Sequence, residues 1–99
     1  MLKKSMIELC ILQLLIQQDM YGYEILHKLK SVFPNTKESE IYVLLRGMFR
    51  NKLTECYEGK ESDGPVRKYY KITPLGQKRK EELEYEWQQL CSAMRTLEL

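Results

Sequence analysis

The sequence predicts a mainly α-helical fold with a small β-hairpin and a long C-terminal helix, and three observations lead to that prediction. Apolar residues recur at helical spacing through the first half of the 99-residue chain. Two short aromatic segments, residues 53–58 and 66–72, are typical of strands and enclose a turn-rich polar loop at 59–65. Thr73 is a good N-cap and Pro74 suits the first helical position, so a last helix is expected to begin there.

Size and composition indicate a single folded domain. A chain of this length cannot be divided into parts that each bury a sufficient core. Hydrophobic residues at 43% and charged residues at 30% are typical of a soluble globular protein. The net charge of +2 identifies no partner, but residues 64–80 hold six cations and no acid, and Glu81, Glu82, Glu84 and Glu86 then reverse the sign. Basic character is therefore local.

The first helix is expected to begin at Ser5, which forms a capping box with Glu8. Residues 7–16 are apolar on nearly all sides of this helix, so it needs two partners, the core of its own chain and a second subunit. The segment superficially resembles a signal peptide, but Glu8 and Gln13 interrupt it, and about eleven residues are too few to span a bilayer. We expect a core helix and no membrane partner.

A second helix is expected to end at Pro34, which cannot continue it. The single histidine, His27, lies off the apolar stripe of this helix, which favours a surface position over a ligand or catalytic role. The stripe itself consists of Tyr23, Ile25, Leu26, Leu29 and Phe33.

A third helix is expected from about Lys37, with Thr36 as its cap. Its buried stripe is Ile41, Leu44, Leu45 and Met48. Its exposed face carries Lys37, Ser39, Tyr42, Arg46 and Arg50. Three helices followed by a hairpin form a winged helix-turn-helix, in which the third helix enters the major groove of DNA and the hairpin lies near the phosphates.

On this interpretation the hairpin cations Lys60, Arg67 and Lys68 neutralise phosphates, and Tyr70 and Ile72 anchor the second strand to the core. Each feature also has a simpler explanation. Cations on a hairpin often form a solvated edge that discourages aggregation, and a tyrosine pair often serves strand packing rather than base stacking. The ordered combination of elements favours DNA binding.

Five large apolar residues of the last helix fall at spacings of 4, 3, 4 and 3, which is an a/d seam over two heptads. They are Leu83, Trp87, Leu90, Met94 and Leu97. Such a seam can pair with another helix of the same chain or with a second copy of the chain.

Catalysis and metal binding find no support in the sequence. It contains no G-x-S-x-G, no phosphate-cradling glycine loop and no H-E-x-x-H. Cys10, Cys56 and Cys91 are odd in number and widely spaced, which indicates reduced thiols in a cytoplasmic protein rather than disulfides or a zinc site. We expect neither enzymatic activity nor a cofactor.

Three motifs resemble the PadR family of bacterial transcriptional regulators, and in particular its smaller subfamily with one helix after the wing: "YGYEIL" at 21–26, "IYVLLRGM" at 41–48 and "GPVRKYYKITPLG" at 64–76. The resemblance implies a winged-helix DNA-binding part at residues 1–73 and a dimerisation helix at 74–99. It further implies a cytoplasmic homodimer, usually a repressor, that binds a palindromic operator in double-stranded DNA and releases it when a small aromatic or multidrug-type ligand binds.

Carried over by position, Tyr42 resembles the family's recognition-helix tyrosine, and Arg67 and Lys68 resemble its wing cations near phosphates. Trp87 matches a tryptophan that faces the ligand at the dimer centre of drug-sensing members. A tryptophan that merely fills the seam is the alternative, since large aromatic residues commonly dominate interface burial.

The third helix departs from the family pattern. Glu38 and Glu40 place two carboxylates where a polyanion should approach, and Gly47 weakens the helix. These departures motivate a second hypothesis, in which the chain is a winged-helix interaction module that pairs with another regulator and binds DNA weakly or not at all. Under either hypothesis, Thr73 is the single residue that joins the wing strand to the last helix.

Overall fold

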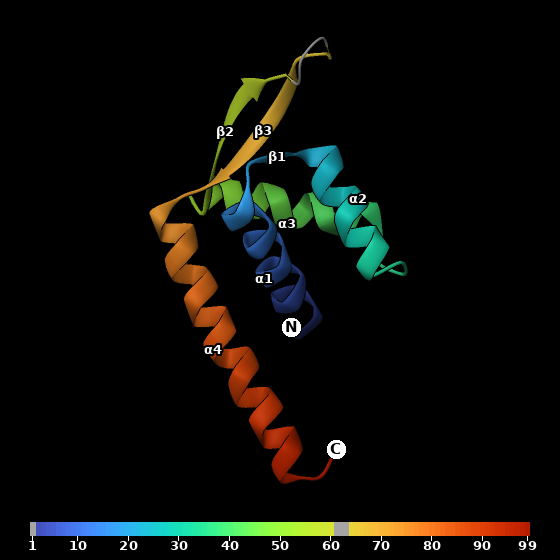
Figure 1. Ribbon diagram of the computed structural model, residues 1–99, viewed down its shortest axis with the longest axis vertical. Coiled ribbons are helices and arrows are strands. Elements are labelled where there is room, and N and C mark those ends of the chain that lie inside the picture. Colours follow the sequence, from blue (N-terminus) through green and yellow to red (C-terminus); the bar gives the residue numbers. More distant parts are fainter. Residues whose placement is uncertain (1, 61–63) are drawn as a thin grey trace.

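The computed structural model describes residues 2–60 and 64–99, which form four helices and one small antiparallel sheet (Figure 1). The tip of the expected hairpin, residues 61–63, lies outside this described part of the chain, as does residue 1. The helices are α1 (Leu2–Gln17), α2 (Gly22–Val32), α3 (Glu38–Arg50) and α4 (Pro74–Thr96). The strands are β1 (Met20–Tyr21), β2 (Thr54–Gly59) and β3 (Arg67–Ile72). The predicted fold class is confirmed.

The sheet has the strand order β1-β3-β2 and is antiparallel throughout. Strands β2 and β3 form the predicted hairpin, in a register that pairs Thr54 with Ile72 and Gly59 with Arg67. Strand β1, between α1 and α2, was not predicted. It has only two residues, too few to show an alternating pattern, and it pairs Met20 with Tyr70 and Tyr21 with Tyr69.

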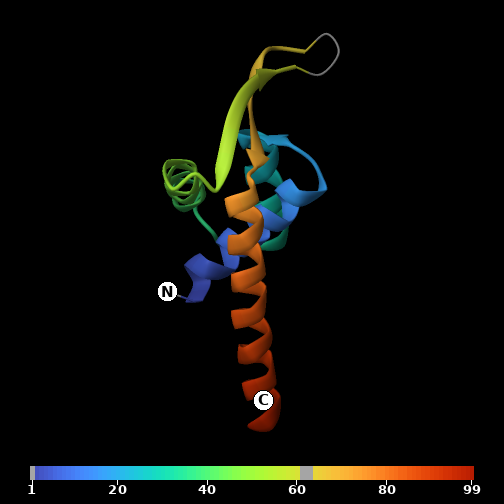
Figure 2. The ribbon, with the colours of Figure 1, turned by 90° about the vertical axis from the view of Figure 1, so that its left-hand side faces the viewer.

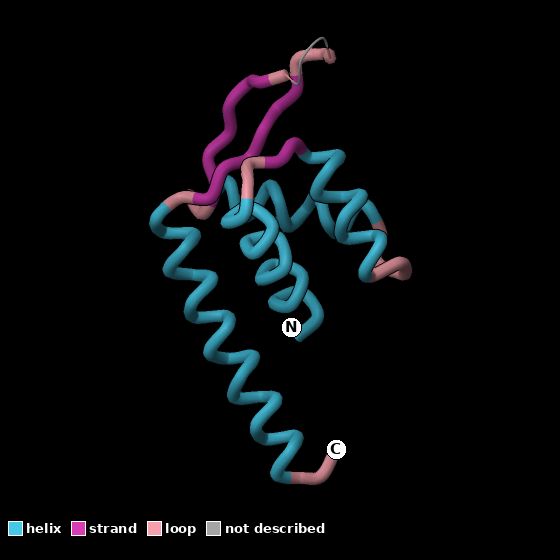
Figure 3. The backbone as a smooth tube through the Cα atoms, viewed as in Figure 1, coloured by secondary structure: helices cyan, strands magenta, loops and turns pink. Residues whose placement is uncertain are grey.

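Helix α1 runs through the middle of the molecule and packs against the other three helices and β3 (Figures 1 and 3). Its central residues Ile11, Leu12 and Leu15 are among the most deeply buried side chains. They form one core with Ile25 of α2 and with Ile41 and Leu45 of α3. The predicted capping box is wrong, because the helix already begins at Leu2 and Ser5 lies within it.

Two details of α2 and α3 also differ from the prediction. Tyr23 is 61% exposed and does not belong to the apolar stripe of α2; its ring stacks on that of the exposed His27 instead, with 6.2 Å between centroids. The N-cap of α3 is Lys37 rather than Thr36, and Thr36 is buried. The predicted core stripe of α3 is confirmed in full.

Helix α4 gives the molecule its elongated shape, 53 × 29 × 21 Å (Figures 1 and 2). Its first turns pack against α1, and its C-terminal half extends away from the rest of the chain. None of the described helices combines the length and hydrophobicity that a bilayer span requires.

Candidate nucleic-acid interface

Helix α3 presents a polar, cationic face to solvent. Burial of Ile41, Leu45 and Met48 fixes which side of the helix points inward. Four of the five residues predicted for the opposite face are exposed: Lys37, Ser39, Arg46 and Arg50. The fifth, Tyr42, is half-buried at the edge of this face, where its ring lies close to Gly22 at the start of α2. A β-carbon on Gly22 would come within 3.7 Å of that ring.

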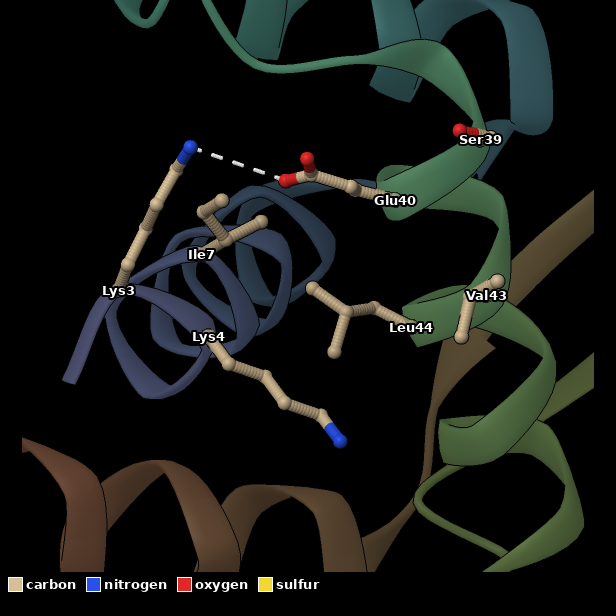
Figure 4. Close-up of a pocket in the computed structure, with 7 residues that line it drawn as sticks. All are labelled: Lys3, Lys4, Ile7, Ser39, Glu40, Val43 and Leu44. Carbon is tan, nitrogen blue, oxygen red and sulfur yellow. Dashed lines mark ion pairs between the residues drawn. The ribbon is translucent and has the colours of Figure 1, made fainter. Parts of the chain in front are cut away.

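The two carboxylates at the start of α3 behave differently. Glu38 is exposed. Glu40 turns toward α1, where its Oε2 lies 3.7 Å from Nζ of Lys3, across a groove that also contains Ile7 and Leu44 (Figure 4). A cation from another element therefore offsets the charge of Glu40, which the sequence could not indicate because the two residues lie 37 positions apart.

The wing cations Arg67 and Lys68 lie on opposite faces of β3, because successive strand residues alternate in direction. Lys68 is on the side of α3, with Nζ 5.4 Å from the ring centroid of Phe49. Arg67 is on the other side, with its guanidinium 4.4 Å above the ring of Tyr21. Lys60, just beyond β2, is exposed. Among the three cations, Lys68 is the one whose place beside α3 is fixed by a contact to that helix.

Three tyrosines form a layer across the outer face of the sheet. Tyr69 of β3 stacks on Tyr57 of β2 with 5.6 Å between ring centroids, and meets Tyr21 of β1 edge-on at the same distance. The Tyr57 hydroxyl donates a 2.6 Å hydrogen bond to Asp19, which raises the pKa of Tyr57 to about 12. A β-carbon on Gly59 would lie 3.0 Å from the Tyr69 ring, so glycine makes room for this layer. Since β1 was not predicted, neither was the layer.

Thr73 ties the start of α4 to the turn between α3 and β2. Its hydroxyl lies 2.7 Å from the carbonyl oxygen of Lys52 and 3.0 Å from that of Leu53, and it accepts a 3.0 Å bond from the Gly76 amide. The predicted N-cap is thereby confirmed. Gly76 allows a close approach, since a β-carbon there would come within 2.2 Å of the Leu53 oxygen. The joint between wing and last helix therefore also includes the turn that follows α3.

The predicted seam of α4 is used within the chain only at its start. Leu83 is buried in the core, whereas Trp87 is 38% exposed and Leu97, just after the helix, is 71% exposed. Leu90 and Met94 are half-buried. A small pocket of about 120 Å³ between α1 and α4 is lined in part by Met6, Leu9, Glu86, Trp87 and Leu90.

No site for a metal or a disulfide is found in the described part of the chain. No group of three or more histidine, cysteine, aspartate or glutamate residues within it is placed to hold a metal ion. Cys10, Cys56 and Cys91 are free and half-buried, and burial raises the pKa of the Cys10 and Cys56 thiols. The polar face of α3 and the wing are thus the principal candidate for function.

Comparison with known proteins gives consistent matches. A family model described as the transcriptional regulator PadR-like family matches residues 11–82. An uncharacterised protein of Lysinibacillus sphaericus is 39% identical over 80 residues, which cover 78% of this chain and 73% of that protein. The crystal structure of a PadR-like transcriptional regulator from Bacillus cereus has 38% identity and a TM-score of 0.83, covering 91% of this chain and 88% of its own.

Two further solved structures extend the similarity. A PadR family transcription regulator from Clostridium difficile has 30% identity and a TM-score of 0.82, over 92% of this chain and 96% of its own. A Streptococcus transcriptional regulator has 28% identity and a TM-score of 0.89, over 99% of this chain and 97% of its own. The similarity therefore extends beyond the matched family region and includes α4.

Proposed function

This chain belongs to the PadR-like family of transcriptional regulators, and from that premise we propose that it is a homodimeric repressor that binds a palindromic operator in double-stranded DNA. In this proposal α3 enters the major groove, the wing contacts phosphates, and α4 with α1 forms the dimer interface. A small aromatic ligand at that interface releases the operator. The protein acts in the cytoplasm.

The observation that carries the proposal is the polar face of α3 with the wing cation Lys68 beside it. Ser39 and Arg46 project from the part of α3 that would face base edges, and arginine is the side chain that most often reads guanine there. Lys60, Arg67 and Lys68 supply affinity for phosphates without reading sequence. Tyr42 and Lys37, at the border of the face, complete the proposed contact surface.

A dimer is proposed because α4 leaves apolar surface open. Trp87, Leu90, Met94 and Leu97 follow the buried Leu83 along one seam and are only partly covered by their own chain. A second copy related by a two-fold axis would cover them and would set the two α3 helices over half-sites about 34 Å apart, or a multiple of that distance. Small domains commonly gain stability by such association.

The ligand site is proposed at Trp87. The pocket beside it, about 120 Å³, is smaller than the roughly 300–1,000 Å³ typical of sites for drug-sized ligands, so a second subunit would have to enlarge it. Glu86 lines this pocket, which favours an aromatic cation. A ligand that binds one spacing of the two α4 helices better than another would shift the population between DNA-competent and incompetent dimers.

The DNA-binding proposal is tested by titrating a fluorescent duplex, taken from the DNA upstream of the chain's own coding sequence, at several salt concentrations. Wild-type protein should bind at low salt. The Arg46→Ala variant should lose roughly 1–3 kcal/mol of sequence-specific binding energy. Replacing both Arg67 and Lys68 with alanine should weaken binding to all sequences and lower the salt slope by about two per protomer. Failure of the wild type to bind any duplex at low salt contradicts the proposal.

A second candidate function is suggested by Glu38, which remains exposed at the end of α3 that should approach DNA. In this alternative the chain is an interaction module that pairs with another regulator. The same double variant, Arg67→Ala with Lys68→Ala, distinguishes the two proposals. Under the first proposal it weakens DNA binding. Under the second it leaves the affinity for the protein partner unchanged.

A further inference from the structure

We propose that Lys3 and Lys4, in the first turns of α1, form a second phosphate-binding site that flanks α3 on the side away from the wing. This inference rests on the proposed DNA-binding function and extends its contact surface to an element to which the sequence assigned only the core and a subunit contact. The contact would be to backbone phosphates and would carry no sequence information.

The arrangement of the elements supports this placement. Helix α3 and the start of α1 project from the same side of α4 (Figure 2). In both views α3 lies between the wing and the start of α1 (Figures 1 and 2). A recognition helix in the major groove has a phosphate backbone on each of its two sides. If the wing contacts one backbone, the start of α1 is placed to contact the other.

A continuous furrow separates α3 from the start of α1. One part, about 500 Å³, is lined by Lys3, Lys4, Ile7, Ser39, Glu40, Val43 and Leu44 (Figure 4). A neighbouring part, about 530 Å³, shares Lys4, Val43 and Leu44 with the first and continues to Arg50 and Arg79. Ser39 and Arg50, both on the proposed DNA-facing side of α3, thus form one wall of the furrow, and Lys3 and Lys4 form the opposite wall.

The charges along the furrow leave a positive excess. Its two carboxylates are already paired, Glu40 with Lys3 at 3.7 Å and Glu8 with Arg79 at 3.1 Å. Lys4 stands one helical turn before Glu8, but Arg79 holds that carboxylate, and no ion-pair partner for Lys4 is found within residues 2–60 and 64–99. Lys3 and Lys4 are both exposed. Their long side chains can follow a phosphate as mobile point charges.

Gly47 gives independent support. It lines the second part of the furrow, and a β-carbon built on it meets nothing within 4 Å. Packing within the chain therefore does not require a glycine at this helix-interior position, where glycine costs up to about 1 kcal/mol relative to alanine. A missing side chain widens the furrow and lets a phosphate backbone come close to α3.

The proposed site lies outside the part of the chain that the family model matches. The family match covers residues 11–82, so Lys3 and Lys4 lie outside it. Glu40, the ion-pair partner of Lys3, is one of the residues that make the start of α3 acidic. Lys3 therefore offsets part of the negative charge at the start of α3.

The test measures binding to a fluorescent duplex of arbitrary sequence and to the duplex from the chain's own upstream region. Replacing Lys3 and Lys4 together with alanine should weaken binding to both, by roughly five- to tenfold per lysine at about 0.1 M salt, and lower the salt slope by about two per protomer. Lys28→Ala is the matched control, because this exposed lysine lines a separate groove between α1 and α2. Equal weakening by Lys28→Ala would show a general charge effect and overturn the site.

A second comparison separates phosphate contact from simple neutralisation of Glu40. In a Glu40→Gln background, Lys3→Ala should still weaken binding and lower the salt slope. No effect there would mean that Lys3 acts only on Glu40, which contradicts the proposal.

Arg46→Ala serves as the positive control for the α3 contact. If wild type binds and Arg46→Ala weakens binding while the lysine variants do not, the second site is refuted and the proposed function stands. If wild type binds no duplex, both fail.

Discussion

Two of the wing cations, Arg67 and Lys68, contact aromatic rings within the protein itself. The Arg67 guanidinium lies over Tyr21, and the Lys68 ammonium lies near both Phe49 and Tyr70. A cation over an aromatic face is attracted by the ring quadrupole, and this limits the positions that a long side chain explores. Less conformational entropy then remains to be lost when the side chain contacts a phosphate.

The hydrogen bond between Tyr57 and Asp19 leads to a prediction about the pKa of Tyr57. Asp19→Asn should lower the pKa of Tyr57 from about 12 toward the ordinary tyrosine value near 10, because the hydrogen bond to the carboxylate is the main cause of the rise. Since the folded-state pKa is raised, the contact stabilises the fold below pH 10, and that stability is lost as the pH rises through about 12. Tyrosinate absorbance during a pH titration measures the change.

Tyr57→Phe is the control for this titration, since it should remove the late-ionising phenol. An unchanged late phase in the Asp19→Asn protein would mean that another tyrosine is responsible for it.

At the residue scale, the sequence predicted the role of a side chain where its contacts are to residues close to it in the chain. Thr73 acts as a cap through the residues that follow it, and that could be read directly. The surroundings of Tyr69 could not be predicted, because its partners Tyr21 and Tyr57 come from two other strands and one of those strands has only two residues. Lys3 was likewise missed, since its role depends on a groove between two helices.

Among the elements, the start of α4 was predicted correctly and the start of α1 was not. Pro74 fixes where α4 begins, because its backbone has no amide hydrogen to continue an earlier helix. No such residue precedes Ser5, so the helix extends to Leu2 although a capping box was available. A helix boundary is therefore easiest to predict where a residue such as proline excludes any other starting point by its covalent structure.

Replacing a helical glycine with alanine should change the stability of the fold in opposite directions at Gly76 and at Gly47. Gly76→Ala should destabilise the fold by about 1–3 kcal/mol, because the new methyl group would overlap the Leu53 carbonyl oxygen and push α4 away from the α3–β2 turn. Gly47→Ala should stabilise it by about 0.5–1 kcal/mol, because the methyl group enters open space and alanine favours the helix. Urea denaturation of the two variants measures both changes.

Thr73→Val serves as a third variant for the same joint, since it keeps the shape of the side chain and removes its hydroxyl. We expect a loss of about 0.5–2 kcal/mol, the usual range for an N-cap. A Gly76→Ala protein as stable as wild type would show that α4 is not held against the turn, and coupling between α4 and α3 would then have to pass through the covalent chain alone.

For the molecule as a whole, the sequence left one question open: whether the α4 seam pairs with a helix of its own chain or with a second copy. Spacings of 4 and 3 are the same whether a helix pairs within its chain or with a copy, so the pattern predicts a seam without naming its partner. The structure divides the seam: Leu83 joins the core of its own chain, whereas Leu90 and Met94 are half-buried and Trp87 and Leu97 are exposed. That division follows the extent of α1, which lies beside only the first half of α4 (Figure 1).

The proposed dimer predicts that charge on the open part of the seam produces monomers. Replacing Leu90 and Met94 with glutamate should place like charges opposite each other across the two-fold interface, at positions that are half-buried even in one subunit. Sedimentation equilibrium should give a dimer for wild type and a monomer for the variant. The midpoint of thermal unfolding should rise with protein concentration only for wild type. Operator affinity should also fall, because two linked half-site contacts become independent ones.

Val66→Glu is the control, because it also replaces an apolar residue with glutamate, at a position on the wing that is 61% exposed and far along the chain from the seam. This variant should remain a dimer with wild-type concentration dependence. A glutamate variant of Leu90 and Met94 that stays dimeric would place the interface elsewhere, and a wild-type protein that is monomeric at all concentrations would remove the dimer. In either case no second subunit would enclose the proposed ligand site at Trp87, and release of the operator by a ligand would need a different mechanism.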